Sequence, residues 1–429
     1  MSAIREHILP NGMTILCWHQ PHLHGLEMGL YLKGGPVYET EDTQGICHLL
    51  EHLCFRGLGG LSHDLLQRTL NRFGAELHGT TYAEAIAFEL KALPRFFDGI
   101  LELFTRFFAG TPWTPEQIAK EKQVVLRQIE QADDGFDEIV DRSWRETQIG
   151  SFPVMGTADT IEALDEDTIL NWQRLVFQPQ NACLVITGNF SEGMERAAVE
   201  AFADIPNYTD EPPFEQMVPL SFTMRDESSD LVMDDDDPDA QACVHLSFDV
   251  DNDSVFPLAV QVLNAITAGN CDSLLFQSLR EDEALVAEID SSVQELGAFS
   301  RLTIRYDVRQ EYLAESLRKV FMYLHRLAMY VRPIRLNQVR TQFTASNALI
   351  TDDVDELNAM AGFAWVAGDI SRADLDAQNQ QFADLSAEEL LDTAQSVFRP
   401  ENLVISIQKN PDVVPGDLAP LLRELRSML

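Results

Sequence analysis

The chain alternates short strand-like runs with longer helix-like runs. Two segments have the apolar pattern of β-strands, in which apolar residues alternate with polar or small ones or form short runs. They are residues 25–32 (GLEMGLYL) and 242–250 (ACVHLSFDV). Segments with apolar residues spaced three and four apart follow both runs, which is typical of amphipathic helices. This mixture predicts an α+β fold in which antiparallel sheets are backed by helices.

Two distant segments share one pattern. Residues 176–181 (VFQPQN) lead into the apolar run 182–186, and residues 397–402 (VFRPEN) lead into the apolar run 403–407. Proline disfavours continuation of a helix, and the β-branched residues that follow suit a strand. Each segment therefore indicates a helix end, a turn and a buried strand, and the repetition predicts two homologous domains.

A stretch rich in proline and aspartate separates the two halves. It includes residues 211–213 (EPP) and 234–238 (DDDDP), and such breakers and like charges mark a linker. The length of 429 residues also exceeds the size of about 250–300 residues at which single cores stop growing. We expect domains at 1–210 and 236–429, joined by a linker at 211–235.

The chain is strongly acidic, with 69 acidic and 31 basic residues and a formal net charge of −38. This charge repels a phosphate backbone and argues against a nucleic-acid partner. The negative charge would attract basic peptides, or it simply keeps the protein soluble. No basic and apolar leader opens the sequence, and no apolar run approaches the ~20 residues that span a bilayer. The six cysteines lack close pairing motifs, so we expect buried free thiols, a reducing cytoplasmic compartment and no membrane partner.

The candidate chemistry lies in residues 48–52 (HLLEH). In a helix, His48 and His52 project from one face and can hold one ion, and Glu51 lies on the same side. Neutral imidazoles are good zinc ligands, and a nearby carboxylate can take a proton from water. The pattern is the inverted zinc-peptidase motif, although a chance match on a partly buried helix gives the same letters.

The neighbouring residues resemble the pitrilysin/insulinase peptidases, the group that also contains mitochondrial processing peptidase. Residues 48–57 (HLLEHLCFRG) are similar to the metal helix of that family, and residues 74–81 (GAELHGTT) to its substrate-binding edge strand. Gly156, Thr157 and Ile161, and the segments 177–188 and 275–280, are also similar to family segments. The resemblance implies two similar halves that face each other across a cleft and enclose an unfolded peptide.

The resemblance also implies roles for single residues. His48 and His52 would be zinc ligands, Glu51 the general base, and Glu121 a residue that supports the ligands. Arg280 would contact the substrate carbonyl. The peptide would bind along the edge strand, through a group of five consecutive residues: Leu77, His78, Gly79, Thr80 and Thr81. His78 stands where the family usually has asparagine, so it is either a substrate contact or an ordinary edge residue.

Two positions depart from the family pattern. The third zinc ligand is normally a glutamate seven residues after the position of Glu121, but the chain has Gln128 there. An amide oxygen is a poorer zinc ligand than a carboxylate. The family also carries a tyrosine seven residues after the arginine, and here that position is Ala287. Some members work as unlike pairs, so Ala287 suggests a heterodimer in which a related chain supplies arginine and tyrosine.

These observations leave two functions open. The first is a zinc-dependent endopeptidase, or its zinc-bearing subunit, which cleaves unfolded peptides. The second is a non-catalytic peptide-binding or regulatory subunit of the same fold, which Gln128 and Ala287 favour. Two other candidate metal sites are weaker. The histidines at 19, 22 and 24 have no carboxylate or cysteine spaced with them and lie in a turn-like stretch, and the aspartates at 234–237 lack the alternating spacing and glycine of a calcium loop.

Overall fold

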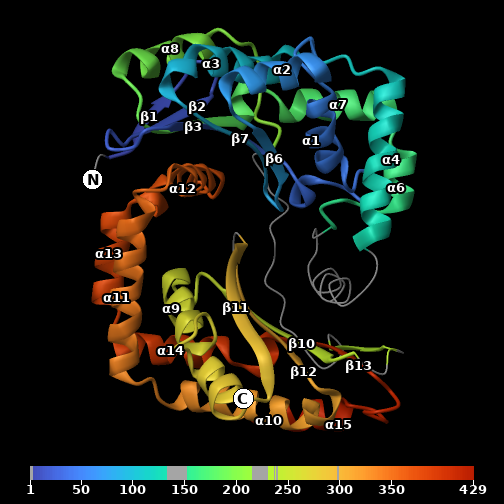
Figure 1. Ribbon diagram of the computed structural model, residues 1–429, viewed down its shortest axis with the longest axis vertical. Coiled ribbons are helices and arrows are strands. Elements are labelled where there is room, and N and C mark those ends of the chain that lie inside the picture. The colour runs from blue at the N-terminus through green and yellow to red at the C-terminus, as the bar shows by residue number, and fades with distance from the viewer. Residues whose placement is uncertain (1–2, 133–151, 215–229, 236, 238–239, 297–298) are drawn as a thin grey trace. The chain divides into compact units, whose positions relative to one another are not determined.

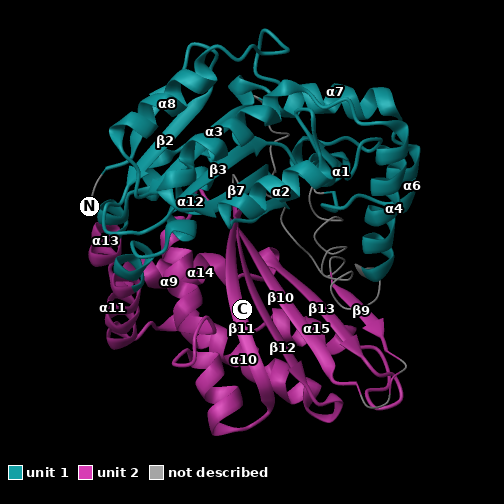
Figure 2. Ribbon diagram, turned by 45° about the horizontal axis from the view of Figure 1, so that its top comes forward, with its two compact units in different colours: residues 1–131, 150–218, 346–378 teal, residues 132–149, 219–345, 379–429 magenta. Residues whose placement is uncertain are grey.

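The computed structural model describes residues 3–132, 152–214, 230–235, 237, 240–296 and 299–429. Figure 2 shows its two compact units. The first contains residues 1–131, 150–218 and 346–378, and the second contains residues 132–149, 219–345 and 379–429. Most of the expected linker, residues 215–229, lies outside the described residues. The bounds 1–210 and 236–429 therefore stay a prediction.

A mixed six-stranded sheet forms the centre of the first unit (Figure 1). Its order is β1 (Arg5–Ile8), β2 (Thr14–His19), β8 (Ala182–Gly188), β3 (Leu26–Lys33), β7 (Ala85–Ala92) and β6 (Leu77–Thr81). Strands β2 and β8 are parallel, and the other neighbours are antiparallel. The predicted α+β class is confirmed, with the correction that the sheet is mixed.

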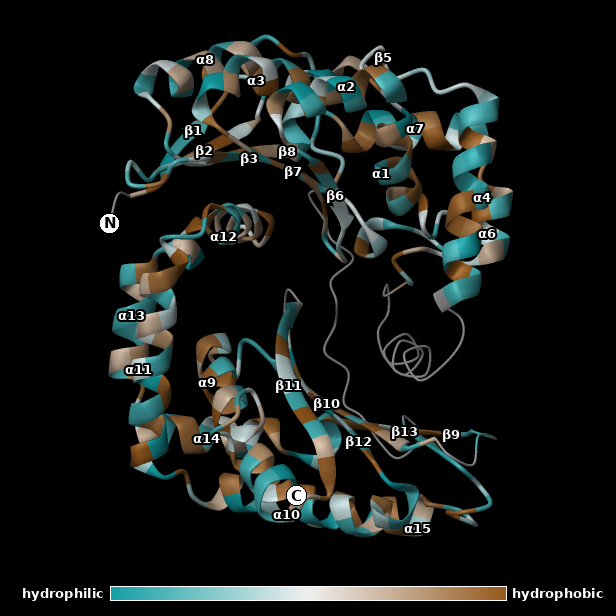
Figure 3. Ribbon diagram, in the orientation of Figure 1, coloured by the Kyte–Doolittle hydropathy of each residue, from teal (hydrophilic) through white to brown (hydrophobic). Residues whose placement is uncertain are grey.

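Helices cover one face of this sheet and bury its alternate side chains, among them Ile15 and Cys17. The elements that complete this layer are α1 (Ile46–Arg56), α2 (His63–Phe73), α3 (Phe97–Thr105), α4 (Pro115–Ala132), α6 (Ala158–Ala163), α7 (Glu166–Val176), α8 (Glu192–Ala203) and the hairpin β4 (Gly57–Leu58) and β5 (Leu61–Ser62). Figure 3 shows hydrophobic and hydrophilic residues on the same helices, as expected of amphipathic elements.

Helix α12 (Val354–Val366), from near the far end of the chain, covers the opposite face of the same sheet (Figure 1). Asn358 enters the sheet, where its Nδ2 donates to the carbonyl oxygens of Glu27 at 3.3 Å and Val185 at 3.2 Å. A Cβ at Gly29 would lie 2.1 Å from Asn358 Oδ1. Because both faces are covered, β3 and β8 are buried along nearly their full length.

Glu27 lies on this second face, at 4 % exposure, and its Oε2 has no hydrogen-bond partner among the described residues. Burial raises the pKa of Glu27 to about 9, assisted by Asp355 and Glu89 and opposed by Lys91. Burial alone would also raise the pKa of Asp355, but interactions with Glu27 and Lys91 outweigh it and lower that pKa. At neutral pH the folded chain therefore holds a proton on Glu27, beside the ionised Asp355.

This proton makes stability depend on pH. The folded chain keeps it to a higher pH than the unfolded chain, whose Glu27 has the ordinary pKa of 4.5, so stability falls as pH rises from about 4.5 to about 9. The Glu27→Gln variant needs no proton. We expect it to have a higher thermal midpoint than the wild type at about pH 8, and a smaller advantage at about pH 5, by calorimetry. Glu76→Gln, at an exposed carboxylate, is the control, and equal midpoints at about pH 8 would contradict this assignment.

The second unit contains a mixed five-stranded sheet in the order β11 (Val286–Leu296), β12 (Phe299–Val308), β10 (Ala242–Asp251), β13 (Leu403–Lys409) and β9 (Leu231–Asp234). Among the described strands of this sheet, only the pair β13 and β9 is parallel. Alternate residues of β10, such as Leu246 and Phe248, pack against helices. The helices in this part of the chain are α9 (Pro257–Thr267), α10 (Leu313–Met329), α11 (Pro333–Ile350), α13 (Leu375–Asp384), α14 (Ala387–Val397) and α15 (Ala419–Arg426).

The repeated sequence segments adopt the same local structure. Helix α7 ends at Val176 and α14 ends at Val397, and each is followed by a short 3-10 turn and then by β8 or β13. The asparagine of each turn donates from Nδ2 to the helix end, Asn181 to the Val176 carbonyl at 3.0 Å and Asn402 to the Val397 carbonyl at 3.2 Å. The prediction of a helix end, a turn and a buried strand is confirmed at both places.

All six cysteines are free, and four of them are buried. The expectation that all are buried is wrong for Cys271, which is exposed, and for Cys243, which is partly exposed. Within the described parts of the chain, no helix has both the length and the apolar character needed to cross a membrane.

Candidate metal centre

Helix α1 holds the motif because its two sides differ in character. Leu49, Leu50 and Leu53 are fully buried in the core of the first unit. The side chains of His48, Glu51 and His52 are 14 %, 10 % and 17 % exposed. The helical spacing therefore brings two imidazoles and one carboxylate to one side of the helix, where they are only slightly exposed to solvent.

A buried carboxylate fixes the start of this helix. Glu39 Oε2 accepts a hydrogen bond from the Gly45 amide at 2.7 Å, and its Oε1 accepts one from the Cys47 amide at 3.0 Å. These amides belong to the first turn, which has no intrahelical acceptors. Burial raises the pKa of Glu39 to about 7, although the two amides and His48 oppose that rise.

The two imidazoles lie against helix α4. Their ring centroids are 4.6 Å apart. His48 Nε2 lies 3.2 Å from Gln128 Oε1, and His52 Nδ1 lies 3.3 Å from Glu121 Oε2. The structure thus brings together the residues that the sequence proposes as ligands and as support.

Glu121 is 2 % exposed and contacts two partners, because the guanidinium of Arg56 also donates to its Oε1. Burial alone would raise the pKa of Glu121, but His52 and Arg56 together outweigh it and lower that pKa. An ionised carboxylate beside Nδ1 would hold the proton of His52 there and would leave Nε2 available to a metal ion. Glu121 therefore has the geometry of a supporting residue.

Glu51 lies between the histidines and the edge strand β6. Its Oε2 is 3.5 Å from His48 Nδ1 and accepts a hydrogen bond from Thr81 Oγ1 at 3.1 Å. The opposite oxygen, Oε1, lies close to Gly79. A carboxylate in this position can accept a proton from a water molecule bound beside the imidazoles.

Strand β6 is the last strand of its sheet and pairs only with β7 among the described strands. Leu77 and Thr81 are buried, whereas His78 and Thr80 are exposed. The side chain of His78 is 67 % exposed and lies 4.0 Å from Glu76. A free strand edge can accept an extended peptide through main-chain hydrogen bonds, with alternate side chains available for contact.

The donor set at this site can be compared with the needs of zinc. Nitrogen and oxygen ligands lie about 2.0–2.2 Å from the ion, so two ligand atoms of a tetrahedral site lie roughly 3.3–3.6 Å apart. The separation of 3.2 Å between His48 Nε2 and Gln128 Oε1 is close to this range. The spacing of His48 and Gln128 therefore suits a zinc ion, with one neutral amide where a carboxylate would add negative charge, and His52 as the third ligand stays a prediction.

Arg280 belongs to the second unit, in a short π-helix at Phe276–Asp282. Its side chain is 44 % exposed, and its guanidinium lies 4.7 Å from the Phe276 ring centroid. Ala287, where the family carries tyrosine, is exposed at the start of β11. The role of Arg280 toward the substrate stays a prediction.

Sequence reasoning missed Glu39 and Arg56, which support helix α1 and Glu121. Arg56 lies inside the segment that resembles the metal helix, so it could have been considered there. Glu39 gives no local signal, because its hydrogen bonds run to backbone amides six and eight residues later in the chain. Only a folded turn brings that carboxylate to the helix start.

A second cluster with metal-ligating residue types has a different character. His7 Nε2 lies 2.7 Å from Glu195 Oε1, and Cys17 is near both. However, Arg5 already donates to both oxygens of Glu195, at 2.5–3.1 Å. Burial raises the pKa of Cys17 to about 12, so its thiol stays protonated. We interpret this cluster as an ion-paired link between β1 and α8.

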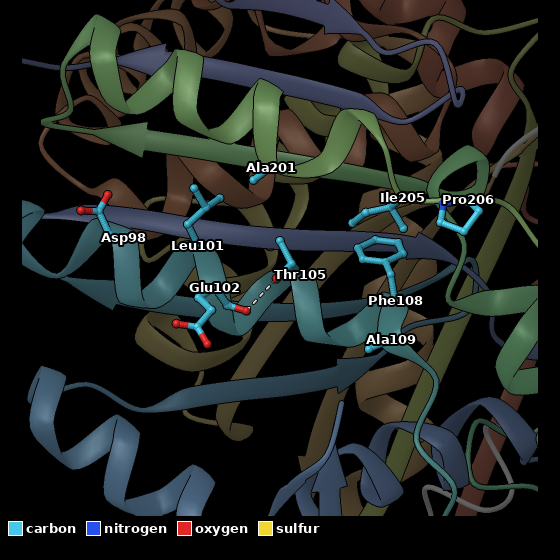
Figure 4. A pocket seen from close by; sticks show the side chains of 9 residues that line it. All are labelled: Asp98, Leu101, Glu102, Thr105, Phe108, Ala109, Ala201, Ile205 and Pro206. Carbon is cyan, nitrogen blue, oxygen red and sulfur yellow. Dashed lines mark hydrogen bonds between the residues drawn. The ribbon is translucent and has the colours of Figure 1, made fainter.

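A groove of about 590 Å³ lies between α3 and α8 (Figure 4). Leu101, Phe108 and Ile205 give it an apolar lining, with Asp98 and Glu102 along one side. Its lining residues include no histidine or cysteine. The groove therefore lacks the chemistry found on α1.

The sequence was compared with models of known families. Residues 14–156 match the model of the insulinase family (peptidase family M16), and residues 163–343 match that of the M16 peptidase inactive domain. The chain belongs to the M16 (insulinase) peptidase family. The resemblance drawn from the motif and its neighbours is confirmed.

The chain is similar to zinc proteases and to a subunit of a processing peptidase. An uncharacterized zinc protease of Rickettsia bellii is 25 % identical over 361 residues, which are 81 % of this chain and 83 % of that relative. The beta subunit of mitochondrial processing peptidase from Lentinula edodes is 23 % identical over 203 residues, 46 % of this chain and 44 % of that subunit. The crystal structure of a protease from Helicobacter pylori has a TM-score of 0.85 at 19 % identity and covers 95 % of this chain and 99 % of that one. This last likeness shows the fold alone.

Proposed function

We propose that this M16 chain is a zinc-dependent endopeptidase, or the zinc-bearing subunit of one, that cleaves unfolded peptides. The observation that carries the proposal is the position of Glu51, which shares one side of α1 with His48 and His52 and contacts the edge strand β6. The general base, the ligands and the peptide-binding edge are thus neighbours within one unit. A bound zinc ion would supply a Lewis acid that polarises the peptide carbonyl.

Each residue of the site would have its own part in the cleavage of a peptide. An extended peptide would pair with the outer edge of β6, which is unpaired among the described strands, and this would place a carbonyl beside helix α1. Glu51 accepts a proton from the attacking water and then gives it to the leaving amine. Glu121 would hold the His52 ring through its contact with Nδ1, and Arg56 would hold Glu121 in turn. Free cysteines suit a reducing compartment, so we place this reaction in the cytoplasm.

The alternative function is a non-catalytic peptide-binding subunit. Gln128 favours it, because a neutral ligand weakens the hold on zinc. The purified chain can separate the two functions. A peptidase should release fragments from an unfolded basic peptide in the presence of zinc and stop after chelation, whereas a binding subunit should retain the intact peptide in both conditions.

Ala287 motivates a heterodimer as part of the proposal. The exposed position of Ala287 leaves room for a larger side chain, so Ala287→Tyr should be accommodated and can supply the missing hydroxyl. We expect this variant to cleave peptides about tenfold faster when it works alone, the lower end of the effect of one hydrogen bond to a charged group. Ala287→Phe is the matched control. A related partner chain should produce a similar gain in the wild type, and a tyrosine variant no faster than the phenylalanine control would contradict a missing hydroxyl.

A further inference from the structure

We propose that strand β6 positions the general base as well as binding the peptide: the Thr81 hydroxyl holds Glu51 Oε2, and Gly79 keeps the space beside Oε1 open. This inference rests on the proposed peptidase function. It assigns Thr81 and Gly79 a role that their place on a substrate-binding strand does not imply. The Thr81 side chain points toward α1, and a side chain at Gly79 would point the same way.

The contact between Thr81 and Glu51 is buried and well constrained. Counted over the whole residue, Thr81 is 9 % exposed and Glu51 is 7 % exposed. The Thr81 hydroxyl lies 3.1 Å from Glu51 Oε2. The backbone of Thr81 is in register with Ile86 of strand β7. A β-branched side chain has few χ1 choices. The sheet therefore fixes the hydroxyl, and the hydroxyl limits the rotation of the Glu51 carboxylate.

The two oxygens of Glu51 consequently differ. Oε2 accepts from Thr81 and lies 3.5 Å from His48 Nδ1. No described residue forms a hydrogen bond with Oε1. That oxygen is the one left to accept a proton from water, so holding Oε2 selects the working oxygen.

Gly79 explains how Oε1 stays accessible. A Cβ at this position would lie 3.0 Å from Glu51 Oε1, and 2.8 Å and 3.0 Å from two ring atoms of Phe55. Carbon atoms rarely approach so closely, so a side chain here would displace either the carboxylate or the ring. The Thr81 hydroxyl thus holds Oε2 of the carboxylate, and the lack of a side chain at Gly79 leaves space beside Oε1.

The catalytic test compares Thr81→Val with Thr81→Ser. Valine keeps the shape of threonine and removes the hydroxyl, and we expect kcat to fall about 10–100-fold with little change in KM, the usual effect of losing a hydrogen bond to a charged group. Serine restores the hydroxyl and should recover most of kcat. Zinc affinity should be the same in all three proteins. Thr393→Val, at a similarly buried threonine of α14, should leave kcat unchanged.

A second measurement does not need activity. In the zinc-free protein, Thr81→Val should lower the thermal midpoint in the wild-type background and have little effect in the Glu51→Ala background, because the hydroxyl has then lost its acceptor. A wild type that cleaves no peptide but shows this coupling would refute the proposed function and retain the contact. Equal midpoint shifts in both backgrounds, or a Thr81→Ser variant as slow as Thr81→Val, would overturn the inference.

Discussion

The Glu51→Gln variant is expected to lose about 10²–10⁴-fold of peptide cleavage, which is the usual contribution of a general base. Glutamine has almost the same shape, and its amide oxygen can still accept from Thr81, so the contact at 3.1 Å should survive. What it lacks is the ability to accept a proton from water. Steady-state cleavage of an unfolded peptide measures the loss.

Zinc binding provides the control for this variant. Glu51 is not among the three ligands proposed, so Glu51→Gln should bind zinc nearly as well as the wild type. Glu130→Gln, on the exposed side of α4, changes the net charge equally and should keep full activity. Unchanged cleavage by Glu51→Gln would show that the activity does not come from this site, and the non-catalytic function would then be preferred.

The Gln128→Glu variant is expected to bind zinc about 10–100-fold more tightly than the wild type, since changes at ligands or their close partners alter metal affinity by roughly this factor. A carboxylate at this place adds negative charge 3.2 Å from His48 Nε2. Carboxylates are strong zinc ligands, whereas a neutral amide is weak. Competition with a chelator of known affinity measures the change.

A matched substitution separates ligation from general charge. Gln123→Glu, at an exposed position of the same helix α4, adds the same charge away from the histidines and should leave zinc affinity unchanged. If Gln128→Glu also gives no gain, the side chain at 128 does not reach the ion, and the ligand assignment for this position is wrong.

Much of the architecture could be predicted from local pattern. The turns at Asn181 and Asn402 repeat because one asparagine side chain closes the same helix end in both halves. Helix α1 (Ile46–Arg56) contains the whole motif, as the helical spacing of His48 and His52 predicts. These features depend on neighbours in sequence, so periodicity and turn residues were sufficient to find them.

Features that join distant segments could not be predicted in this way. Asn358 enters the first sheet beside Gly29, more than 300 residues earlier in the chain, and neither residue signals the other. The mixed character of both sheets likewise comes from pairing between distant strands. At the site, the residue types of the motif were evident, whereas the support from Glu39 and Arg56 required the fold.

Zinc titration of the metal-free protein by calorimetry tests the central claim most directly. The account predicts one site per chain that is lost in both His48→Ala and His52→Ala and retained in Glu51→Gln. The account would be contradicted if the wild type bound no zinc, or if the two histidine variants bound zinc as strongly as the wild type.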